Sequence, residues 1–236
     1  MARSPRSPNN FLASLSSSDF KFLHPHLKLI ELRHETVLFE TGARVENVYF
    51  PHSGIISLVV PLSGGQIIEA AMVGHDSLVG ASSALNGRIS LNKGIVQLPG
   101  AASVMPVAPF RKAAEQSDTF RTALVQHEQV LFAQAQQSAA CNATHKTEAR
   151  LARWLLRARD LSGEDTMELT QEFLSQMLGV QRTSVSDVAN GLQKLDLIDY
   201  NRGLVQLINV RGLRKEACEC YAVVKSHYDR LLNGER

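Results

Sequence analysis

The residues best suited to chemistry lie between positions 170 and 195, in the stretch TQEFLSQMLGVQRTSVSDVANGLQKL. At about 100° per residue, the apolar side chains of the second half share one helix face: Val185, Val188, Leu192 and Leu195. Short hydrogen-bonding side chains occupy the opposite face, together with one arginine. Such groups can reach base edges, with Arg suited to guanine, Asn or Gln to adenine, and Ser or Thr to either. The free face therefore predicts base recognition in a DNA groove.

The neighbouring elements would position this helix. Thr170 is a good N-cap for a first helix that buries Leu174, Met177 and Leu178, and Gly179 supplies the turn that ends it. A hairpin is predicted from Leu197 to Ile208, with its turn at residues 201–203. The order helix, glycine turn, amphipathic helix and hairpin is typical of a winged helix-turn-helix. The alternatives are a helical pair with an incidental hairpin, or a surface that binds a partner protein.

Expected roles are assigned to eleven polar residues of this region and the hairpin. Base readout is assigned to Gln181, Arg182, Thr183, Ser186, Asp187 and Asn190. Contact with the DNA backbone is assigned to Thr170, Gln171, Ser184, Asn201 and Arg202. Thr170 and Ser184 could instead cap helices, and Asp187 could be a solvated surface acid.

Residues 27–107 have a different composition and pattern. Short runs rich in Val, Ile and Leu, such as NVYF, GIISLVV and QIIEAAMV, alternate with turn signals such as Ser63-Gly64-Gly65 and Asn92-Lys93-Gly94. Seven or eight short strands with this spacing predict an antiparallel sandwich or jelly roll.

Helix formers dominate from Phe110 onward. A helix over residues 118–141 places Leu124, Leu131 and Ser138 seven apart, with Ala135 beside them. This spacing fits a dimer seam, and packing onto the chain's own sheet is the alternative. Cap-type residues at Asn142-Ala-Thr144 predict an interruption, so residues 140–145 are the expected hinge. A further helix is expected over 145–160, and a final helix from Val210 to Leu232.

Composition excludes several classes of protein. The net charge is only +2, with 44% hydrophobic and 20% charged residues, which is ordinary for a globular chain. Cys141, Cys218 and Cys220 are too few and too clustered for a disulfide framework. The start MARSPRSPNN has no apolar run behind it, so neither a signal peptide nor a membrane span is expected, and a cytoplasmic location follows.

A family resemblance rests on these motifs. LTQEFLSQMLGVQRTSVSDVANGLQKLDLI followed by DYNRGLVQL resembles the C-terminal domain of the Crp/Fnr family of bacterial regulators. VENVYFPHSGIISLVV ahead of GHDSLVG resembles the family's N-terminal β-roll, and the likeness covers about residues 20 to 215. The resemblance implies a homodimer whose recognition helices enter successive major grooves of a pseudo-palindromic site. It also implies double-stranded DNA and RNA polymerase as partners.

The sequence departs from the family at both of its sites. The family's recognition helix commonly opens with Ser-Arg-Glu-Thr, whereas this chain has Gln181-Arg182-Thr183-Ser184, so Arg182 keeps its match and a different operator is expected. Members that bind cyclic nucleotide carry Gly-Glu-Leu and a later Arg-Ser or Arg-Thr pair. Here Ala81 follows Gly80, which disfavours cyclic AMP. An anion or other small molecule remains the alternative to a vestigial sensor, with the candidate pocket at Gly80, Ala81, Ser82, Ser83 and Arg88.

Other chemistries receive little support. No cysteine precedes Cys141, which argues against the family's iron-sulfur sensor because a cubane requires four ligands. The histidines of the sensor half show no metal-site spacing, and a cupin-like metal enzyme would need a His-x-His-Glu cluster inside the strands. Neither a catalytic residue, a metal nor a cofactor is therefore expected. Cys141 is interpreted as a buried structural thiol, with a redox handle as the alternative.

The expected architecture is α+β: an N-terminal double-stranded β-roll, a jelly roll like the cyclic-nucleotide-binding domain, then a long dimerisation helix and a C-terminal winged helix-turn-helix. Residues 1–19 are assigned to a flexible N-terminal tail, 20–116 to the β-roll, 117–142 to the dimerisation helix and hinge, and 143–236 to the DNA-binding domain. An effector would act through the orientation of the two recognition helices.

Overall fold

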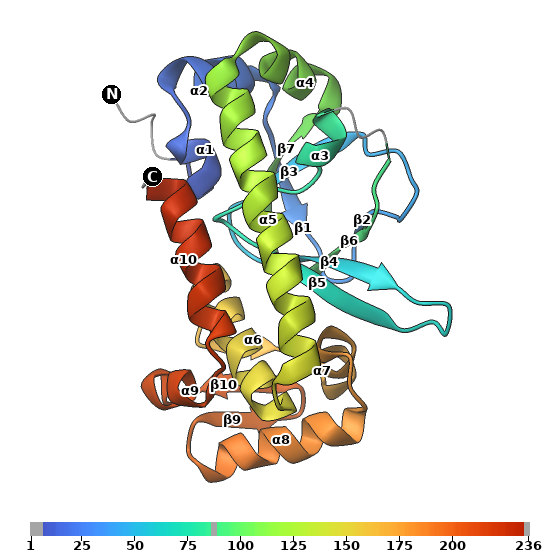
Figure 1. Ribbon diagram of the computed structural model, residues 1–236, viewed down its shortest axis with the longest axis vertical. Helices are drawn as coiled ribbons and strands as arrows, with labels where there is room; N and C mark the ends of the chain where they lie inside the picture. Colours follow the sequence, from blue (N-terminus) through green and yellow to red (C-terminus); the bar gives the residue numbers. More distant parts are fainter. Residues whose placement is uncertain (1–6, 86–88, 234–236) are drawn as a thin grey trace.

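A computed structural model describes residues 7–85 and 89–233 of the chain. A β-rich part packs along one side of a long helix, and a small C-terminal part lies at the C-terminal end of that helix (Figure 1). This arrangement confirms the expected fold class. No helix among the described residues has the length and apolar character that crossing a membrane requires.

The N-terminal segment packs into the β-rich part. It forms α1 (Asn10–Ser14), α2 (Ser17–Leu23) and the short 3-10 helix η1 (His24–His26). Phe11 and Leu12 are each 1% exposed. The side-chain amide of Asn9 donates to the carbonyls of Pro51 (2.9 Å) and Ser77 (2.8 Å). The expected flexible tail over 1–19 is therefore wrong from Asn9 onward.

The β-roll consists of two antiparallel sheets. One has the order β1 (Lys28–Leu32), β7 (Gly100–Pro106), β3 (Asn47–Pro51). The other has the order β2 (Val37–Phe39), β6 (Lys93–Leu98), β4 (Ile55–Pro61), β5 (Ile67–Val73). Val48 and Phe50 from the first sheet and Val96 from the second are fully buried in the same core. Two helices accompany the roll, α3 (Ala81–Ala84) and α4 (Val107–Gln116).

The long helix α5 (Asp118–Thr144) begins after Ser117, whose hydroxyl accepts from the amide of Phe120. The interruption expected at residues 142–144 does not occur, because α5 continues to Thr144 and ends at the extended His145 (φ −98, ψ 148). The next helix, α6 (Thr147–Ser162), begins two residues later and ends at Gly163 in the left-handed region. The break between the helices is therefore His145-Lys146.

The expected seam of α5 faces its own chain. Leu124 is 0% and Ser138 is 7% exposed, and Leu131 and Ala135 line a cavity of the β-roll. The seven-residue spacing thus marks the face that α5 buries within the chain, which is the alternative considered above. Two large apolar side chains on another face of α5 are exposed instead, Val125 at 45% and Phe132 at 64%.

The C-terminal part contains a small antiparallel sheet with the order β8 (Thr166–Glu168), β10 (Leu204–Leu207), β9 (Ile198–Asn201). The helices α7 (Gln171–Leu178) and α8 (Arg182–Lys194) pack with α6 against it. Strand β8 was not predicted, because three residues carry no recognisable period.

The expected final helix is two helices, α9 (Val210–Glu216) and α10 (Cys220–Asn233). Helix α10 leaves the C-terminal part and runs beside α5 (Figure 1). The hydroxyl of Tyr228 on α10 donates to Gln134 Oε1 on α5 over 2.8 Å. The last helix therefore packs on α5 as well as on α6 of the C-terminal part.

Candidate nucleic-acid interface

The turn between α7 and α8 depends on two residues. Thr170 caps α7, because its Oγ1 accepts from the amide of Phe173 over 3.1 Å. Gly179 ends the helix with φ 63, and a Cβ atom there would lie 2.6 Å from Ile68 Cδ1 in β5. The left-handed backbone favours glycine here, and a Cβ atom would also displace the end of the Ile68 side chain.

Helix α8 is amphipathic, as its periodicity predicts. Val185 and Leu192 are 0% exposed and Ala189 is 1% exposed. Leu195 is 53% exposed, which corrects its assignment to the buried face, because α8 ends at Lys194 and the chain turns. The predicted base-reading residues Gln181, Arg182, Thr183, Asp187 and Asn190 are all exposed. One side of α8 is therefore free for a partner.

Gln171 holds the two helices together. Its Oε1 accepts from Ser186 Oγ over 2.8 Å and from Arg182 Nε over 3.5 Å. Ser186, expected as a base reader, is half-buried in this contact. Ser184 is half-buried as well, so these two hydroxyls are less accessible than the rest of the face.

The hairpin brings a second arginine close to the first. Asn201 and Arg202 are exposed at the turn between β9 and β10, where Arg202 has φ 50 and Gly203 has φ 82. A concavity of about 360 Å³ is lined by Thr170, Gln171, Arg182, Tyr200, Arg202 and Gly203. It gathers the predicted residues from the start of α7, the start of α8 and the wing.

Tyr200 was missed by the sequence analysis. Its hydroxyl donates to the carbonyl of Leu169 over 2.8 Å. Burial raises the pKa of Tyr200, while the nearby Arg182 charge lowers it. The alternation of polar and apolar residues in DYNRGLVQL could have identified it as a half-buried residue next to the predicted site.

The two arginines of this surface, Arg182 and Arg202, have no acidic partner in the part of the chain that the structure describes. Within the described residues, no carboxylate forms an ion pair with Arg182 or Arg202 within 4.0 Å. Two unpaired guanidinium groups beside one concavity favour an anionic partner.

Buried polar contacts fix this part against the β-roll. Trp154 Nε1 on α6 donates to Glu69 Oε1 on β5 over 2.9 Å. Arg157 on α6 forms a buried ion pair with Asp76 over 2.7 Å. Burial raises the pKa of Glu69, and hydrogen bonds from Ser57 and Trp154 and the charges of Arg153 and Arg157 oppose that shift. The orientation of α8 is thus coupled to β5 through α6.

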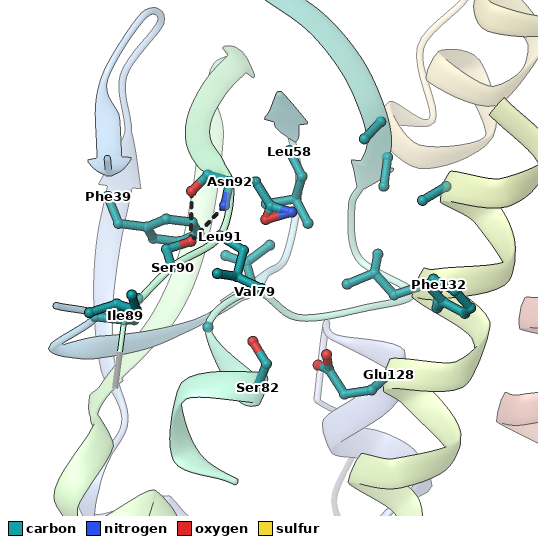
Figure 2. A pocket seen from close by; sticks show the side chains of 16 residues that line it. Phe39, Leu58, Val79, Ser82, Ile89, Ser90, Leu91, Asn92, Glu128 and Phe132 are labelled. Carbon is teal, nitrogen blue, oxygen red and sulfur yellow. Dashed lines mark hydrogen bonds between the residues drawn. The ribbon is translucent and has the colours of Figure 1, made fainter. Parts of the chain in front are cut away.

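The β-roll contains a cavity of about 340 Å³ next to α5. Figure 2 shows the apolar side chains of Phe39, Leu58, Val79 and Phe132 around it, together with Ser82 and Glu128. Because Leu131, Phe132 and Ala135 contribute from α5, a molecule in this cavity would contact the long helix directly. The sequence pattern of the strands did not predict that α5 lines the cavity.

The expected effector residues are only partly at this cavity. Gly80 and Ser82 line it, whereas Ala81 is 1% exposed and belongs to the core. Ser83 lies in α3, and Arg88 falls outside the described residues.

Comparison with known proteins identifies one domain family and several solved structures with a similar fold. Residues 149–216 match the family model described as the Crp-like helix-turn-helix domain. No curated protein sequence matches the chain significantly.

Solved structures share the fold at low sequence identity. FixK2 from Bradyrhizobium japonicum has a TM-score of 0.70 and 17% identity over 81% of this chain and 98% of its own. A transcriptional regulator of the CRP/FNR family from Thermus thermophilus has a TM-score of 0.66 and 19% identity over 80% and 98%. The c-di-GMP responsive global regulator CLP from Xanthomonas campestris has a TM-score of 0.61 and 17% identity over 81% and 99%. Each of these likenesses covers 80 or 81% of this chain.

Proposed function

We propose that this chain, which carries a Crp-like helix-turn-helix domain within the fold of the Crp/Fnr regulators, binds specific DNA sequences as a homodimer and thereby regulates transcription. The observation that carries the proposal is the free face of α8 beside the wing. Arg182, Thr183 and Asn190 are exposed on that face, and the concavity next to it holds Arg202, which has no acidic partner among the described residues. Base edges and phosphates are the ligands that these side chains suit best.

The residues of this interface fall into groups that lie on α8, at the wing tip and at the start of α7. Arg182 opens α8 and is free to approach guanine, and Thr183, Asp187 and Asn190 lie on the same exposed side. Arg202 and Asn201 sit at the wing tip, where phosphate contact is expected. Thr170 caps α7 and also lines the concavity.

The exposed stripe of α5 supports the homodimer. Val125, Phe132 and Ala139 are exposed at spacings of seven residues, with Gln129 and Gln136 between them. A seven-residue repeat on an exposed face suits a parallel pairing of two copies of α5. The two α8 helices would then be related by a two-fold axis and would read the halves of a pseudo-palindrome.

The cavity beside α5 supports a small-molecule effector in preference to a vestigial sensor. Its walls are mainly apolar, with Ser82, Ser90, Asn92 and Glu128 as polar groups. The Glu128 carboxylate in the lining suits a molecule with hydroxyl or amide groups rather than a cyclic phosphate. Such a molecule would act only through a difference in affinity between two orientations of α5 and α6. RNA polymerase as a further partner rests on the family likeness alone.

The decisive experiment is selection of bound duplexes from a random DNA pool by the purified, ligand-free protein at physiological salt. Enrichment of a two-fold-symmetric site is expected. A pool that stays unenriched, with no weak salt-sensitive binding, would refute the proposal. Weak binding without enrichment would indicate that the free dimer holds α8 in the wrong orientation, and the selection would be repeated with metabolite fractions.

A further inference from the structure

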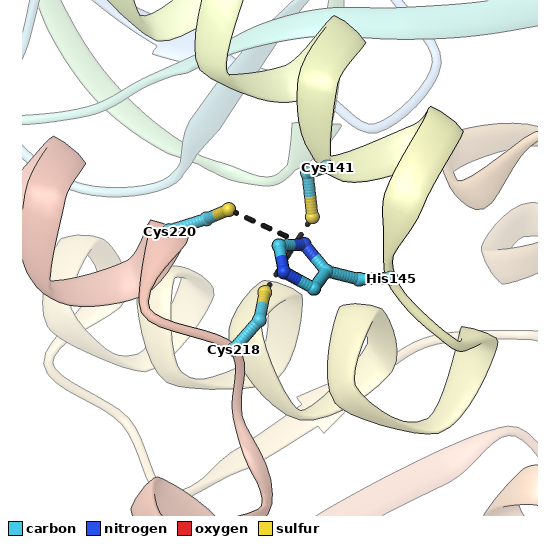
Figure 3. Close-up of side chains that lie close together, drawn as sticks. All are labelled: Cys141, His145, Cys218 and Cys220. Atoms are coloured by element: carbon cyan, nitrogen blue, oxygen red, sulfur yellow. Dashed lines mark hydrogen bonds between the residues drawn. The ribbon is translucent and has the colours of Figure 1, made fainter.

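The break between α5 and α6 lies next to the link between α9 and α10. Cys141 is in the last turn of α5, and His145 follows the helix four residues later. Cys218 lies between α9 and α10, and Cys220 is the first residue of α10. Figure 3 shows the three sulfur atoms and the imidazole turned toward one another. All three cysteines are buried and free, and His145 is half-buried.

We propose that Cys141, His145, Cys218 and Cys220 form a zinc site that ties the end of α5 to the start of α10. One ligand atom from each residue lies within 4.8 Å of all the others. Three thiolates and one imidazole are a common ligand set for structural zinc, which takes four ligands in a tetrahedron.

The separations between ligand atoms fit one tetrahedral ion. With Zn–S bonds of about 2.3 Å and Zn–N bonds of about 2.0 to 2.1 Å, a tetrahedron places two sulfurs about 3.8 Å apart and a sulfur and nitrogen about 3.6 Å apart. The Cys141 and Cys218 sulfurs are 3.5 Å apart, and Cys220 Sγ lies 3.6 Å from His145 Nδ1. Small side-chain adjustments would therefore complete the coordination.

His145 is already oriented as a metal ligand. Its Nδ1 faces the sulfurs, while its Nε2 lies 3.2 Å from Glu219 Oε1. A carboxylate on the outer nitrogen fixes the ring and the tautomer in many zinc sites. Glu219 thus supplies the outer contact that such a histidine needs.

Two neighbouring groups would stabilise negative charge at the site. Gln137 Nε2 donates to Cys220 Sγ over 3.0 Å. The Arg153 guanidinium interacts electrostatically with Cys141. Arg153 would offset part of the negative charge that three thiolates leave on the bound ion.

Two other uses of these cysteines fit less well. A disulfide would require sulfurs about 2.05 Å apart, and a Cys141–Cys218 bond would leave the convergence of Cys220 and His145 unexplained. An iron-sulfur cluster attaches its protein ligands to separate irons, so they surround a larger body than one ion. With four protein ligands and no open position, the site would be structural and not catalytic.

The zinc site would act on the junction of the two parts of the chain. Cys141 and His145 bracket the end of the long helix, and Cys218 and Cys220 begin the helix that packs back onto it. Zinc would hold these two connections in one geometry, and so limit the positions that α6 and α8 can take. Metal binding at these four residues does not depend on the proposed DNA binding.

The test is metal analysis of the full chain purified under reducing conditions. We expect one zinc ion per chain by mass spectrometry. We also expect the Co²⁺-substituted protein to show the visible d–d bands and near-ultraviolet charge-transfer bands of a tetrahedral thiolate site. The variant Glu219→Gln should retain the fold and bind zinc about 10- to 100-fold more weakly. The variant Cys218→Ser should lower the zinc affinity by a larger factor. The variant His26→Gln, which changes an exposed histidine of η1, should bind like the wild type.

Three results would overturn the proposal. The first is a folded wild-type protein that takes up no zinc after reduction and zinc addition. The second is a Co²⁺ spectrum without thiolate charge transfer. The third is unchanged zinc affinity in both Glu219→Gln and Cys218→Ser, and circular dichroism would establish that each variant is folded. Because the wild-type Co²⁺ spectrum needs no variant, misfolding of Cys218→Ser would not remove the test.

Discussion

The indole nitrogen of Trp154 donates a 2.9 Å hydrogen bond to the carboxyl oxygen of Glu69, and both side chains are buried between α6 and β5. The second Glu69 oxygen accepts from Ser57 Oγ. This contact joins the helix-turn-helix part to the sheet that also lines the cavity beside α5. Because α6 packs against α8, a change in β5 has a direct physical route to the recognition helix.

The first prediction concerns the pH dependence of this junction. Burial raises the pKa of Glu69 above its ordinary value of 4.5, so the folded state binds the proton more tightly than the unfolded state. Its contribution to stability is then fully present below pH 4.5 and is lost as pH rises through the folded-state pKa. Glu69→Gln keeps an oxygen for Trp154 and a polar partner for Ser57 without the charge. We expect the variant to be more stable than the wild type at neutral pH, and the difference to vanish in acid.

Thermal unfolding of both proteins at a series of pH values measures this difference. Glu31→Gln, which changes an exposed glutamate of β1, is the matched control and should leave the pH profile unchanged. A wild-type advantage over Glu69→Gln that grows as pH rises would show that the charges of Arg153 and Arg157 outweigh burial.

The second prediction concerns the exposed stripe of α5. If two copies pair along Val125 and Phe132, Phe132→Ala removes buried apolar area worth about 1.5 to 3 kcal/mol per side chain. The dimer dissociation constant should rise at least about tenfold, measured by sedimentation of a dilution series. Leu29→Ala is the control, because Leu29 is 72% exposed on β1, away from the stripe. Since Phe132 also lines the cavity, Val125→Ala serves as an independent change, and unaltered dimerisation of both variants would remove α5 from the interface.

Local patterns predicted α8 well because its buried face follows the helical period. Val185 and Leu192 are buried as expected. The predicted burial of Leu195 is wrong because this residue lies beyond the end of the helix, where the helical period no longer applies. The seven-residue spacing on α5 correctly indicated a buried face around Leu124, but spacing alone does not say which surface covers it.

Contacts between distant positions were beyond the sequence analysis. Trp154 and Glu69 are 85 residues apart, and Cys141 and Cys218 are 77 apart. The cysteine cluster arises because the expected final helix breaks at residues 217–219 and returns along α5. The spacing Cys141-x-x-x-His145 and the pair Cys218-x-Cys220 are each typical of metal ligands, but the separation of 77 residues between Cys141 and Cys218 hides their proximity in space.

The third prediction concerns the wing. Arg202 is exposed at the β9–β10 turn and unpaired among the described residues, so Arg202→Ala should remove one phosphate contact per protomer. Affinity should fall by a similar factor on every DNA sequence, and the salt slope should decrease by about one unit per lost contact. Alanine tolerates the φ of 50 no worse than arginine, so the fold should be kept. Arg33→Ala on the β-roll is the control, and a slope unchanged from the wild type would place the wing outside the DNA interface.

The fourth prediction concerns Arg182, the first residue of α8. If its guanidinium reads guanine, Arg182→Ala should cost about 1 to 3 kcal/mol on the selected site and relax the preference at one base pair per half-site. Arg182→Lys separates charge from geometry, because lysine keeps the positive charge and loses the paired N–H groups that match guanine. We expect the lysine variant to bind non-specific DNA like the wild type but to discriminate poorly at that base pair. Competition titrations on the selected site and on duplexes changed at each position measure both effects.

Equal losses of affinity on all duplexes, restored by lysine, would instead assign Arg182 to a phosphate contact. Because Gln171 also accepts from Arg182, Gln171→Ala should reproduce a small part of the loss without changing which base pair is preferred.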